Sequence, residues 1–351
     1  MSDNKKRVLN VGYGKTALVN EYYKGGMSSR HFYGSIELEK SGRYHVINVS
    51  LDSNQGIKGT IHNNMMMLKT ADVVFIPYLF VAPFIALSIL KYMGLTHKKM
   101  IAICHTRMKK SDSRIVNLYY KMIYHSFDVV FFHSQKNMEE SIADKSINPS
   151  KARFLYWGDD LDYIDNTFPN CTQGDFFIST GREQRDYDSI VSAFKDLNIP
   201  LEIYTNRSNY TNHYDTLEAI EGVYPNIRIE FVERNNSSTV KLAKRTSECL
   251  CVVIPLLNAH INYCLGLTSV VEAMAMGKPI ISSYNPYSPV DIEKEKIGMV
   301  VGAGLTWKDA IEYIATHREE AREMGKRGRL LAERLFNIKK CVSQLEDVIN
   351  S

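Results

Sequence analysis

The sequence has 351 residues, of which 44% are hydrophobic and 23% charged, a balance that excludes a disordered, collagen-like or coiled-coil chain. The net charge of +4, from 43 basic and 39 acidic residues, is too small to indicate nucleic-acid binding. At about 100–200 residues per domain, the length predicts two domains.

The cysteines and the N-terminus indicate a cytoplasmic protein. The six cysteines are scattered, and Cys249 and Cys251 lack the spacing of a metal or redox pair, so we expect reduced thiols. The first residues are polar and lead directly into a short strand, which is not the pattern of a signal peptide.

Short apolar runs alternate with longer helical patterns along the first half. Within 111–127, apolar residues recur at helical spacing and predict an amphipathic helix with Ile115, Leu118, Tyr119, Met122 and Ile123 on its apolar face. The apolar run 73–90 contains Pro77 and Pro83, so it predicts a strand, a turn and a helix that begins near Pro83, not a spanning helix. The predicted strands are 7–11, 44–49, 73–77, 100–104, 129–132 and 153–156.

The second half repeats this alternation, with helices predicted over 187–197 and 269–276. Its predicted strands are 176–180, 201–204, 227–231, 251–255, 279–282 and 299–301. Apolar strands separated by helices predict an α/β protein with two doubly wound domains, divided near 162–175. Ligands of such sheets bind at the carboxyl ends of the strands, and two facing domains place the site in the cleft between them.

Several strand ends carry candidate site residues, each with a structural alternative. Gly12-Tyr-Gly14-Lys15-Thr16 lacks the spacing of a nucleotide P-loop, because Leu9 stands where that motif needs glycine. Gly25-Gly26 precedes a predicted helix through 31–39, so its N–H groups either face an anion or form a simple turn. His105 ends a central strand and either points into the cleft or lies in the core. Asp160 and Asp162 fit a structural turn better than a metal site.

The second half holds the strongest pair of motifs. Thr180-Gly181-Arg182 and Arg185 join a strand to a helix, and arginine gives planar donors to phosphate oxygens; the alternative is a solvated turn. Further on, Thr268 or Ser269 is predicted to cap a helix whose N–H groups face a diphosphate. Glu272, one turn inside that helix, can accept bonds from both ribose hydroxyls or act as a capping-box glutamate.

Together these residues resemble the retaining GT-B glycosyltransferases of family four, in order and over nearly the whole chain. The most specific match is Glu272-Ala-Met-Ala-Met-Gly277-Lys-Pro279, which resembles the signature EAMAxGxP. The 180–187 segment resembles the donor motif, and Gly25-Gly26 resembles the glycine-rich first loop. The other matches are His105 with the first-domain histidine, His133-Ser134 with the strand-end serine, and Tyr156-Trp-Gly158-Asp-Asp160 with the GVD turn.

The resemblance implies two Rossmann-like domains facing across a cleft. It gives an N-terminal acceptor-side domain over 1–165, a C-terminal nucleotide-sugar-binding domain over 166–335, and a C-terminal helix over 336–351 that packs back on the first domain. It implies a hexosyltransferase that moves a sugar from a UDP- or GDP-linked donor to a glycan or lipid-linked acceptor with retention, in surface polysaccharide synthesis. No metal and no other cofactor is expected.

The resemblance also implies a role for each residue. Arg182 and Arg185 would neutralise the diphosphate, Glu272 would hold the ribose, and His105 would contact the donor sugar near its reacting carbon. The implied donor-binding residues are Gly25, Gly26, Gly181, Thr268, Ser269 and Cys264. Cys264 stands where many members have a second glutamate, so the contacts of the donor sugar stay open, with Asn258, His260 and Asn262 as candidates.

The acceptor side is suggested by charge. Residues 97–121 carry seven Lys or Arg against one Asp, which is either a contact for anionic lipid at the inner membrane face or a solvated helix face. Two other functions remain open: a sugar-nucleotide epimerase of the same fold, and a non-catalytic donor-binding scaffold in which Cys264 marks lost chemistry.

Overall fold

The structure is a computed structural model that describes residues 5–11, 16–49, 62, 65, 67–79, 85–206, 214–233, 236–257, 264–302 and 304–351. The chain forms two compact units. The N-terminal unit comprises Met1–Lys24, Ser29–Trp157 and Ile338–Ser351, and the C-terminal unit comprises Gly25–Ser28 and Gly158–Asn337. The end of the chain is thus grouped with its beginning, and the Gly25–Ser28 segment with the second half.

The N-terminal unit is built on a six-stranded parallel sheet in the order β2-β1-β3-β4-β5-β6. Its strands are β1 (Lys6–Val11), β2 (Tyr44–Val49), β3 (Val73–Ile76), β4 (Lys99–Cys104), β5 (Val129–Phe132) and β6 (Ala152–Phe154). The strand order reverses at β1: the chain passes from β1 to β2 on one side and then to β3 on the other side of β1. The point between β1 and β3 is the topological switch point of the sheet.

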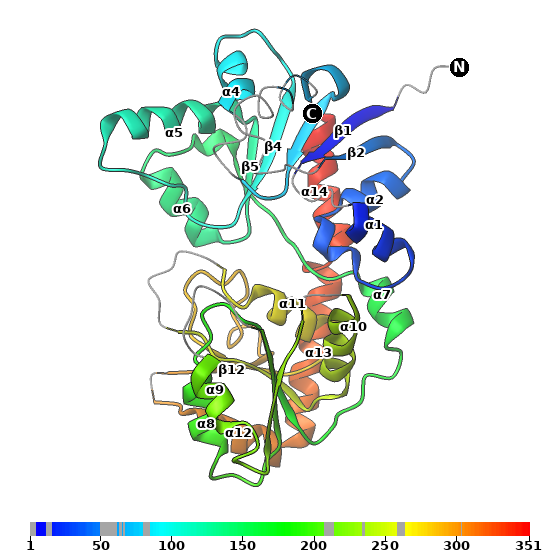
Figure 1. Ribbon diagram of the computed structural model, residues 1–351, viewed down its shortest axis with the longest axis vertical. Helices are drawn as coiled ribbons and strands as arrows, with labels where there is room; N and C mark the ends of the chain where they lie inside the picture. The colour runs from blue at the N-terminus through cyan, green and yellow to red at the C-terminus, as the bar shows by residue number, and fades with distance from the viewer. Residues whose placement is uncertain are drawn as a thin grey trace. The chain divides into compact units, whose positions relative to one another are not determined.

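Helices cover both faces of this sheet. Figure 1 shows α4, α5 and α6 on one face and α1, α2 and α14 on the other. The helices are α1 (Thr16–Tyr23), α2 (Ser35–Lys40), α4 (Ile85–Tyr92), α5 (Arg114–Ser126), α6 (Gln135–Ala143) and α14 (Ile338–Asn350), with 3-10 turns η1 (Ser29–Phe32) and η3 (Pro149–Lys151).

The C-terminal unit repeats the architecture with the order β12-β11-β10-β7-β8-β9, again all parallel. Its strands are β7 (Phe177–Thr180), β8 (Leu201–Thr205), β9 (Ile227–Phe231), β10 (Cys251–Ile254), β11 (Ile280–Ser283) and β12 (Gly298–Val301). The strand order reverses between β7 and β10. The predicted α/β class with two doubly wound sheets is therefore confirmed.

The helices of this unit also form two layers. In Figure 1, α8 and α12 lie on one face, and α10, α11 and α13 lie on the other. The helices are α7 (Leu161–Thr167), α8 (Tyr187–Phe194), α9 (Tyr214–Ile220), α10 (Asn236–Glu248), α11 (Leu267–Ala275), α12 (Trp307–Thr316) and α13 (Arg318–Arg334).

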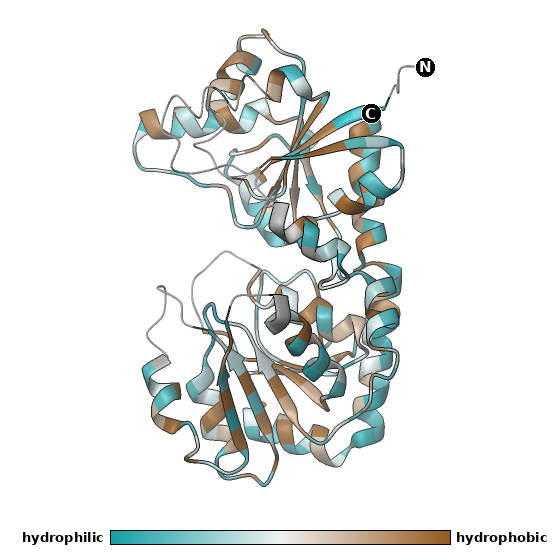
Figure 2. Ribbon diagram, turned by 45° about the vertical axis from the view of Figure 1, so that its right-hand side comes forward, coloured by the Kyte–Doolittle hydropathy of each residue, from teal (hydrophilic) through white to brown (hydrophobic). Residues whose placement is uncertain are grey.

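The strands are apolar along their length because helices cover both of their faces. Figure 2 shows hydrophobic residues concentrated in the two sheets. All four residues of β3 and of β10 are buried, at the centres of the two cores. This continuous burial explains why short apolar runs located the strands correctly.

One helix prediction was wrong, and a second was confirmed as a helix but not in the burial of its first turns. The helix expected over 31–39 is broken: η1 ends at Phe32, Tyr33 and Gly34 adopt positive φ angles of 51° and 88°, and α2 begins only at Ser35. In α5, Ile123 is buried as expected, but Ile115 is 82% and Leu118 70% exposed. The fully buried residues of this helix lie in its C-terminal half, so helical spacing alone did not show that Ile115 and Leu118 lie outside the core.

The apolar run 73–90 divides as predicted into a strand, β3, and a later helix, α4; Pro83 lies outside the described residues. Among the helices of the described ranges, none combines the length and the hydrophobicity needed to cross a bilayer.

Candidate functional site

The C-terminal unit gathers most of the predicted site residues at one edge of its sheet. β7 and β10 are neighbours at the point where strand order reverses, and ligands of such sheets bind beside the carboxyl ends of those strands. Thr180 ends β7 and leads into Gly181, and α11 follows β10 in the chain. The predicted arginines and the start of α11 therefore share this edge.

Arg185 is held firmly at this edge. The backbone of Arg185 forms an isolated antiparallel bridge with Leu256. Its guanidinium donates to the carbonyls of Glu183 (3.0 Å) and Thr180 (3.5 Å). Only 6% of Arg185 is exposed. A charged donor group is thereby fixed at the switch point by backbone carbonyls.

Gly181 makes room for that guanidinium. Its φ of +128° is unfavourable for residues with a side chain, and a Cβ placed there would lie 2.5 Å from Nη2 of Arg185. The hydroxyl of Tyr187, the first residue of α8, donates to the Gly181 carbonyl. Glycine is therefore required at this position both by the backbone conformation of the turn and by the space that the Arg185 guanidinium occupies.

Arg182 is more exposed and differently engaged. About 30% of its side chain is exposed, and Nη2 contacts Oε1 of Glu183 at 3.0 Å. An exposed pair of this kind contributes little to stability and exchanges easily for another anion. Arg182 can thus turn toward a phosphate, whereas Arg185 already has a fixed position.

The start of α11 differs from the prediction. Neither Thr268 nor Ser269 caps the helix: the N-cap is Gly266, in the left-handed region at φ 77°, without a side-chain cap. Thr268 and Ser269 instead occupy the first turn, where backbone N–H groups have no intrahelical acceptor. The Ser269 hydroxyl lies 3.4 Å from the carbonyl of Thr180, which ties α11 to the end of β7.

Glu272 lies in the second turn of α11, six residues after the cap, and is half-buried. A capping-box glutamate stands three residues after the cap, so that alternative is excluded. Glu272 follows Ser269 by three residues, which puts both on one side of the helix.

Two other predicted donor-binding positions have identifiable local roles. Cys264 is buried and its thiol lies 3.4 Å from the carbonyl of Tyr287. Gly25 has a φ of +77° and Gly26 follows it; the same segment is fixed by Ser28, whose hydroxyl donates to Asp159 at 2.6 Å. The candidates Asn258, His260 and Asn262 lie outside the described residues.

Asp160 has the structural role that the sequence favoured. Its carboxylate accepts from the N–H of Tyr163 at 3.1 Å and caps α7. In the described ranges, no three His, Cys, Asp or Glu side chains gather as a metal site requires.

In the N-terminal unit, His105 follows β4 and lies in a cluster of aromatic rings. Its ring stacks on Tyr78 with centroids 3.8 Å apart, and its Nε2 donates to the Pro77 carbonyl at 2.9 Å. Tyr33, His133 and Trp157 pack behind this pair. Tyr33 and Trp157 stack with centroids 5.5 Å apart, and the positive φ of Tyr33 places a strained residue at the centre of the cluster.

Burial keeps both histidines neutral. It lowers the pKa of His105 to about 4, although the bond to Pro77 opposes the shift. Burial, together with the neighbouring His105, lowers the pKa of His133 well below its usual value. Because a carbonyl can only accept, the proton of neutral His105 is on Nε2.

The sequence analysis missed the rings around His105. Tyr78 and Trp157 follow β3 and β6 closely, so their place after strand ends was a usable signal. Tyr33 gave no such signal in the sequence, because its position depends on the break between η1 and α2.

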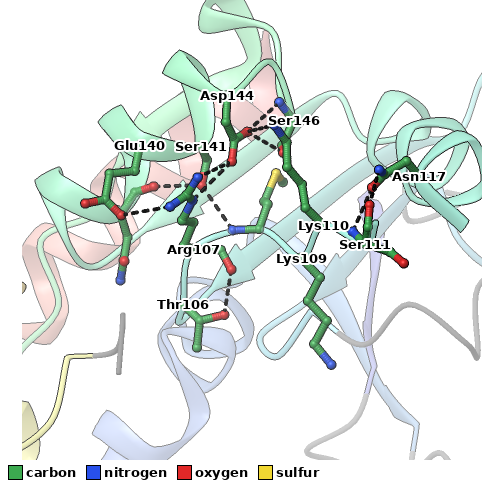
Figure 3. Close-up of polar contacts among 12 residues, drawn as sticks. Thr106, Arg107, Lys109, Lys110, Ser111, Asn117, Glu140, Ser141, Asp144 and Ser146 are labelled. Carbon is green, nitrogen blue, oxygen red and sulfur yellow. Dashed lines mark hydrogen bonds and ion pairs between the residues drawn. The ribbon is translucent and has the colours of Figure 1, made fainter. Parts of the chain in front are cut away.

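The protein itself neutralises part of the basic segment. Figure 3 shows Arg107 meeting Asp144 and Glu140, while Lys109 extends away from this network. The Arg107 guanidinium lies 2.9 Å from Asp144 and 3.7 Å from Glu140, and Lys110 lies 3.7 Å from Asp144. Desolvation of Asp144 is outweighed by bonds from Ser146 and Arg107, so its pKa is lowered.

Four cations of the segment have no ion pair within the described residues: Lys99, Lys109, Arg114 and Lys121. Two of them lie on α5 beside its exposed Ile115 and Leu118. The predicted basic patch is therefore a smaller surface of mixed basic and apolar character, which we call the α5 surface and define as Lys109, Arg114, Ile115, Leu118 and Lys121.

Solved structures of low sequence identity match the whole chain. A glycosyltransferase from Rickettsia africae matches with a TM-score of 0.68 at 12% identity, over 98% of each chain. HepE from Anabaena, in complex with UDP and glucose, matches with a TM-score of 0.65 at 10% identity, over 99% of this chain and 100% of HepE. The chain has the GT-B fold. A UDP-N-acetylglucosamine 2-epimerase from Rickettsia bellii matches with a TM-score of 0.51 at 12% identity, over 99% of this chain and 98% of its own.

No protein-family model and no curated protein matches the sequence significantly. At 10–12% identity these structures establish the GT-B fold, and the chemistry has to be argued from the site.

Proposed function

We propose that the protein is a glycosyltransferase that takes a hexose from a nucleoside-diphosphate sugar and transfers it with retention at the anomeric carbon. The observation that carries the proposal is Arg185, a buried guanidinium fixed at the switch point of the C-terminal sheet beside the first turn of α11. A donor diphosphate is the ligand whose charge this arrangement suits.

The proposed chemistry follows from where charge develops. As the sugar departs, negative charge grows on the leaving diphosphate and positive charge on the anomeric carbon. Arg185, Arg182 and the first N–H groups of α11 stabilise the diphosphate charge, and preorganised donors of this kind lower the barrier because they need no reorientation. Glu272 holds the ribose hydroxyls in this proposal, one helical turn beyond Ser269.

A UDP-linked donor is the first choice to test. HepE shares the fold and its structure contains UDP and glucose. Neutral His105 serves this proposal as a hydrogen-bonding group toward the donor sugar and not as a positive charge, because burial lowers its pKa to about 4.

For the acceptor we propose a lipid-linked glycan at the inner face of a membrane. The α5 surface supports this, because unpaired cations attract anionic headgroups and exposed Ile115 and Leu118 add apolar contact. In this proposal the protein is cytoplasmic and contacts the membrane peripherally, as part of surface polysaccharide synthesis.

The test measures UDP binding by calorimetry and release of UDP from UDP-hexoses, for the natural protein and for Arg185→Ala. We expect UDP to bind the natural protein, and Arg185→Ala to lower turnover by about 10²–10³-fold, as loss of one preorganised donor does. Lys308→Glu, a charge change on α12, is the matched control and should leave both unchanged.

Three outcomes contradict the proposal. If Arg185→Ala turns over donor at the rate of the natural protein, the donor site does not lie at that edge of the sheet. Interconversion of UDP-hexoses without UDP release makes the protein an epimerase. Tight UDP binding with no release of UDP under any acceptor makes it a donor-binding scaffold.

A further inference from the structure

A cavity lies in the C-terminal unit, at the opposite edge of the sheet from Arg185. Its volume is about 850 Å³, and it is enclosed by the segment that follows α7, the C-terminal end of α11 and one face of α13. Leu250 and Pro279, which line it, immediately precede β10 and β11. Because α11 runs nine residues, about 13 Å, from the proposed donor site to this cavity, the two sites are separate.

The floor of the cavity is apolar. Phe168, Leu250 and Met276 line it and are exposed by 9%, 0% and 3%. Cavities of about 300–1,000 Å³ with apolar linings are typical of sites for small organic molecules. The size and the floor therefore suit the body of such a molecule.

The walls carry more positive than negative charge. Arg322, Lys326 and Arg329 follow one another on α13 at positions i, i+4 and i+7, which share one face of a helix. Arg329 is bonded to both carboxylates that line the cavity, Asp165 at 2.7 Å and Glu333 at 2.8 Å. The carboxylate partners of Arg322 and Lys326 are Glu319 and Glu323, exposed on the same helix, and such pairs are weak. Arg322 also donates to the side-chain oxygen of Gln173 at 3.4 Å.

The cavity also contains a buried ammonium group. Lys278 is 4% exposed, and its Nζ donates to the carbonyls of Cys249 (2.9 Å) and Thr172. Lys278 forms no ion pair within the described part of the chain, and two acceptors leave one of its three N–H donors over. Its pKa is lowered by burial. A buried cation without a counter-ion gains most when an anion enters beside it.

We propose that this cavity binds a small phosphate ester, whose organic body lies on the apolar floor and whose phosphate is matched by Lys278, Arg322 and Lys326. The ester is chosen because four cations and two carboxylates line the cavity, which leaves an excess of two positive charges for a dianion. The site is independent of the proposed donor site.

Cys171 provides a local reporter of occupancy. It lines the cavity and is exposed, whereas the other five cysteines are buried. The experiment measures the rate at which iodoacetamide alkylates Cys171, by mass spectrometry of the full-length protein, with phenyl phosphate as the probe and phenol as its neutral counterpart. Each measurement is made with and without saturating UDP.

We expect phenyl phosphate to slow alkylation of Cys171 about threefold at twice its Kd, by mass action, with or without UDP. Phenol should have no such effect at the same concentration. Arg322→Glu with Lys326→Glu should abolish the protection, while Lys308→Glu, on a different helix, should retain it. Both substituted side chains are more than half exposed, so the fold should tolerate the change.

The proposal is overturned if phenyl phosphate gives no protection at about 20 mM, which is 20 times the Kd of a millimolar site. It is also overturned if phenol protects equally, if protection survives in the double variant, or if UDP alone gives the same protection. Failure of UDP to bind would contradict the proposed function without affecting this result.

Discussion

Gly181 and Arg185 form one unit although they are four positions apart in the chain. The guanidinium occupies the space that any side chain at 181 would need, with 2.5 Å between a Cβ there and Nη2. The sequence predicted both residues as donor-binding but not this dependence. Only the path of the loop, fixed by Leu256 and by the hydroxyl of Tyr187, reveals it.

His105 makes the stability of the protein depend on pH. Its pKa is about 4 in the folded protein and near 6.5 when unfolded, so between these values the unfolded chain binds more protons. The free energy of unfolding should therefore fall as pH falls from about 7 to 4, by about 2 kcal/mol at pH 5 from this residue alone. Urea unfolding at pH 7.5 and pH 5.0 measures the difference.

His105→Asn should reduce that difference by about the same 2 kcal/mol, because asparagine does not titrate. Tyr33, Tyr78 and His133 contact His105 and remain in the variant, and His133 continues to contribute in the same direction. An unchanged pH difference in His105→Asn would show that the imidazole is not desolvated in the folded protein.

At the scale of elements, α13 packs on the turn after α11 through a glycine. A Cβ on Gly325 would lie 2.0 Å from the Gly277 carbonyl, which side-chain repacking cannot relieve. Gly325→Ala should therefore destabilise the protein by about 1–3 kcal/mol, the cost of overpacking, although alanine favours helices. Thermal unfolding of the two forms gives the measurement.

Gly328, one turn later on α13, is the matched control. A Cβ there meets its nearest atom, Cα of Met274, at 3.6 Å, which is ordinary contact. Gly328→Ala should stabilise the protein by about 0.5–1 kcal/mol through helix propensity. Equal effects of the two substitutions would mean that α13 does not approach the turn so closely.

The exposure of Ile115 and Leu118 on the α5 surface was not predicted from the sequence. Helical spacing shows that Ile115 and Leu118 share a face of the helix, but it cannot show where along the helix the protein core ends. The structure buries Ile123 and exposes Ile115 and Leu118, which lie in the first two turns. Exposed apolar side chains that lie together, such as Ile115 and Leu118, are typical of surfaces that bind a protein or a membrane.

Ile115→Asp with Leu118→Asp should abolish flotation with anionic liposomes while leaving the melting temperature unchanged, since both side chains are already exposed. Val223→Asp, at an exposed position (57%) of the C-terminal unit, is the control and should float like the natural protein. High salt should weaken binding of both floating forms. Flotation of the double variant would exclude the α5 surface as the membrane contact.

At the scale of the whole molecule, the last helix belongs to the first unit. Cys341 and Leu345 of α14 are fully buried, and the Gln344 side chain bonds the backbone at Phe154 and Tyr156, both at 2.9 Å. The closing helix therefore completes the N-terminal core, and the stability of that unit depends on the far end of the chain.

Leu345→Ala should destabilise the N-terminal unit by about 2–5 kcal/mol, the range for removing a buried leucine. The protein has two tryptophans, Trp157 in the N-terminal unit and Trp307 in the C-terminal unit. Fluorescence-monitored urea unfolding in Trp307→Phe and Trp157→Phe backgrounds therefore reports each unit separately. A shift only in the Trp157 signal is expected; equal shifts of both would contradict a local role for α14.

The sequence by itself determined the two parallel sheets and the residues at their carboxyl edges. Buried parallel strands must be apolar on both faces, and glycine, arginine and histidine directly after them stand out. It could not determine the cap of α11, the break before α2, the exposed turns of α5 or the rings around His105. Each of these depends on contacts between residues far apart in the chain, which propensity and spacing do not contain, so only the tertiary structure decided them.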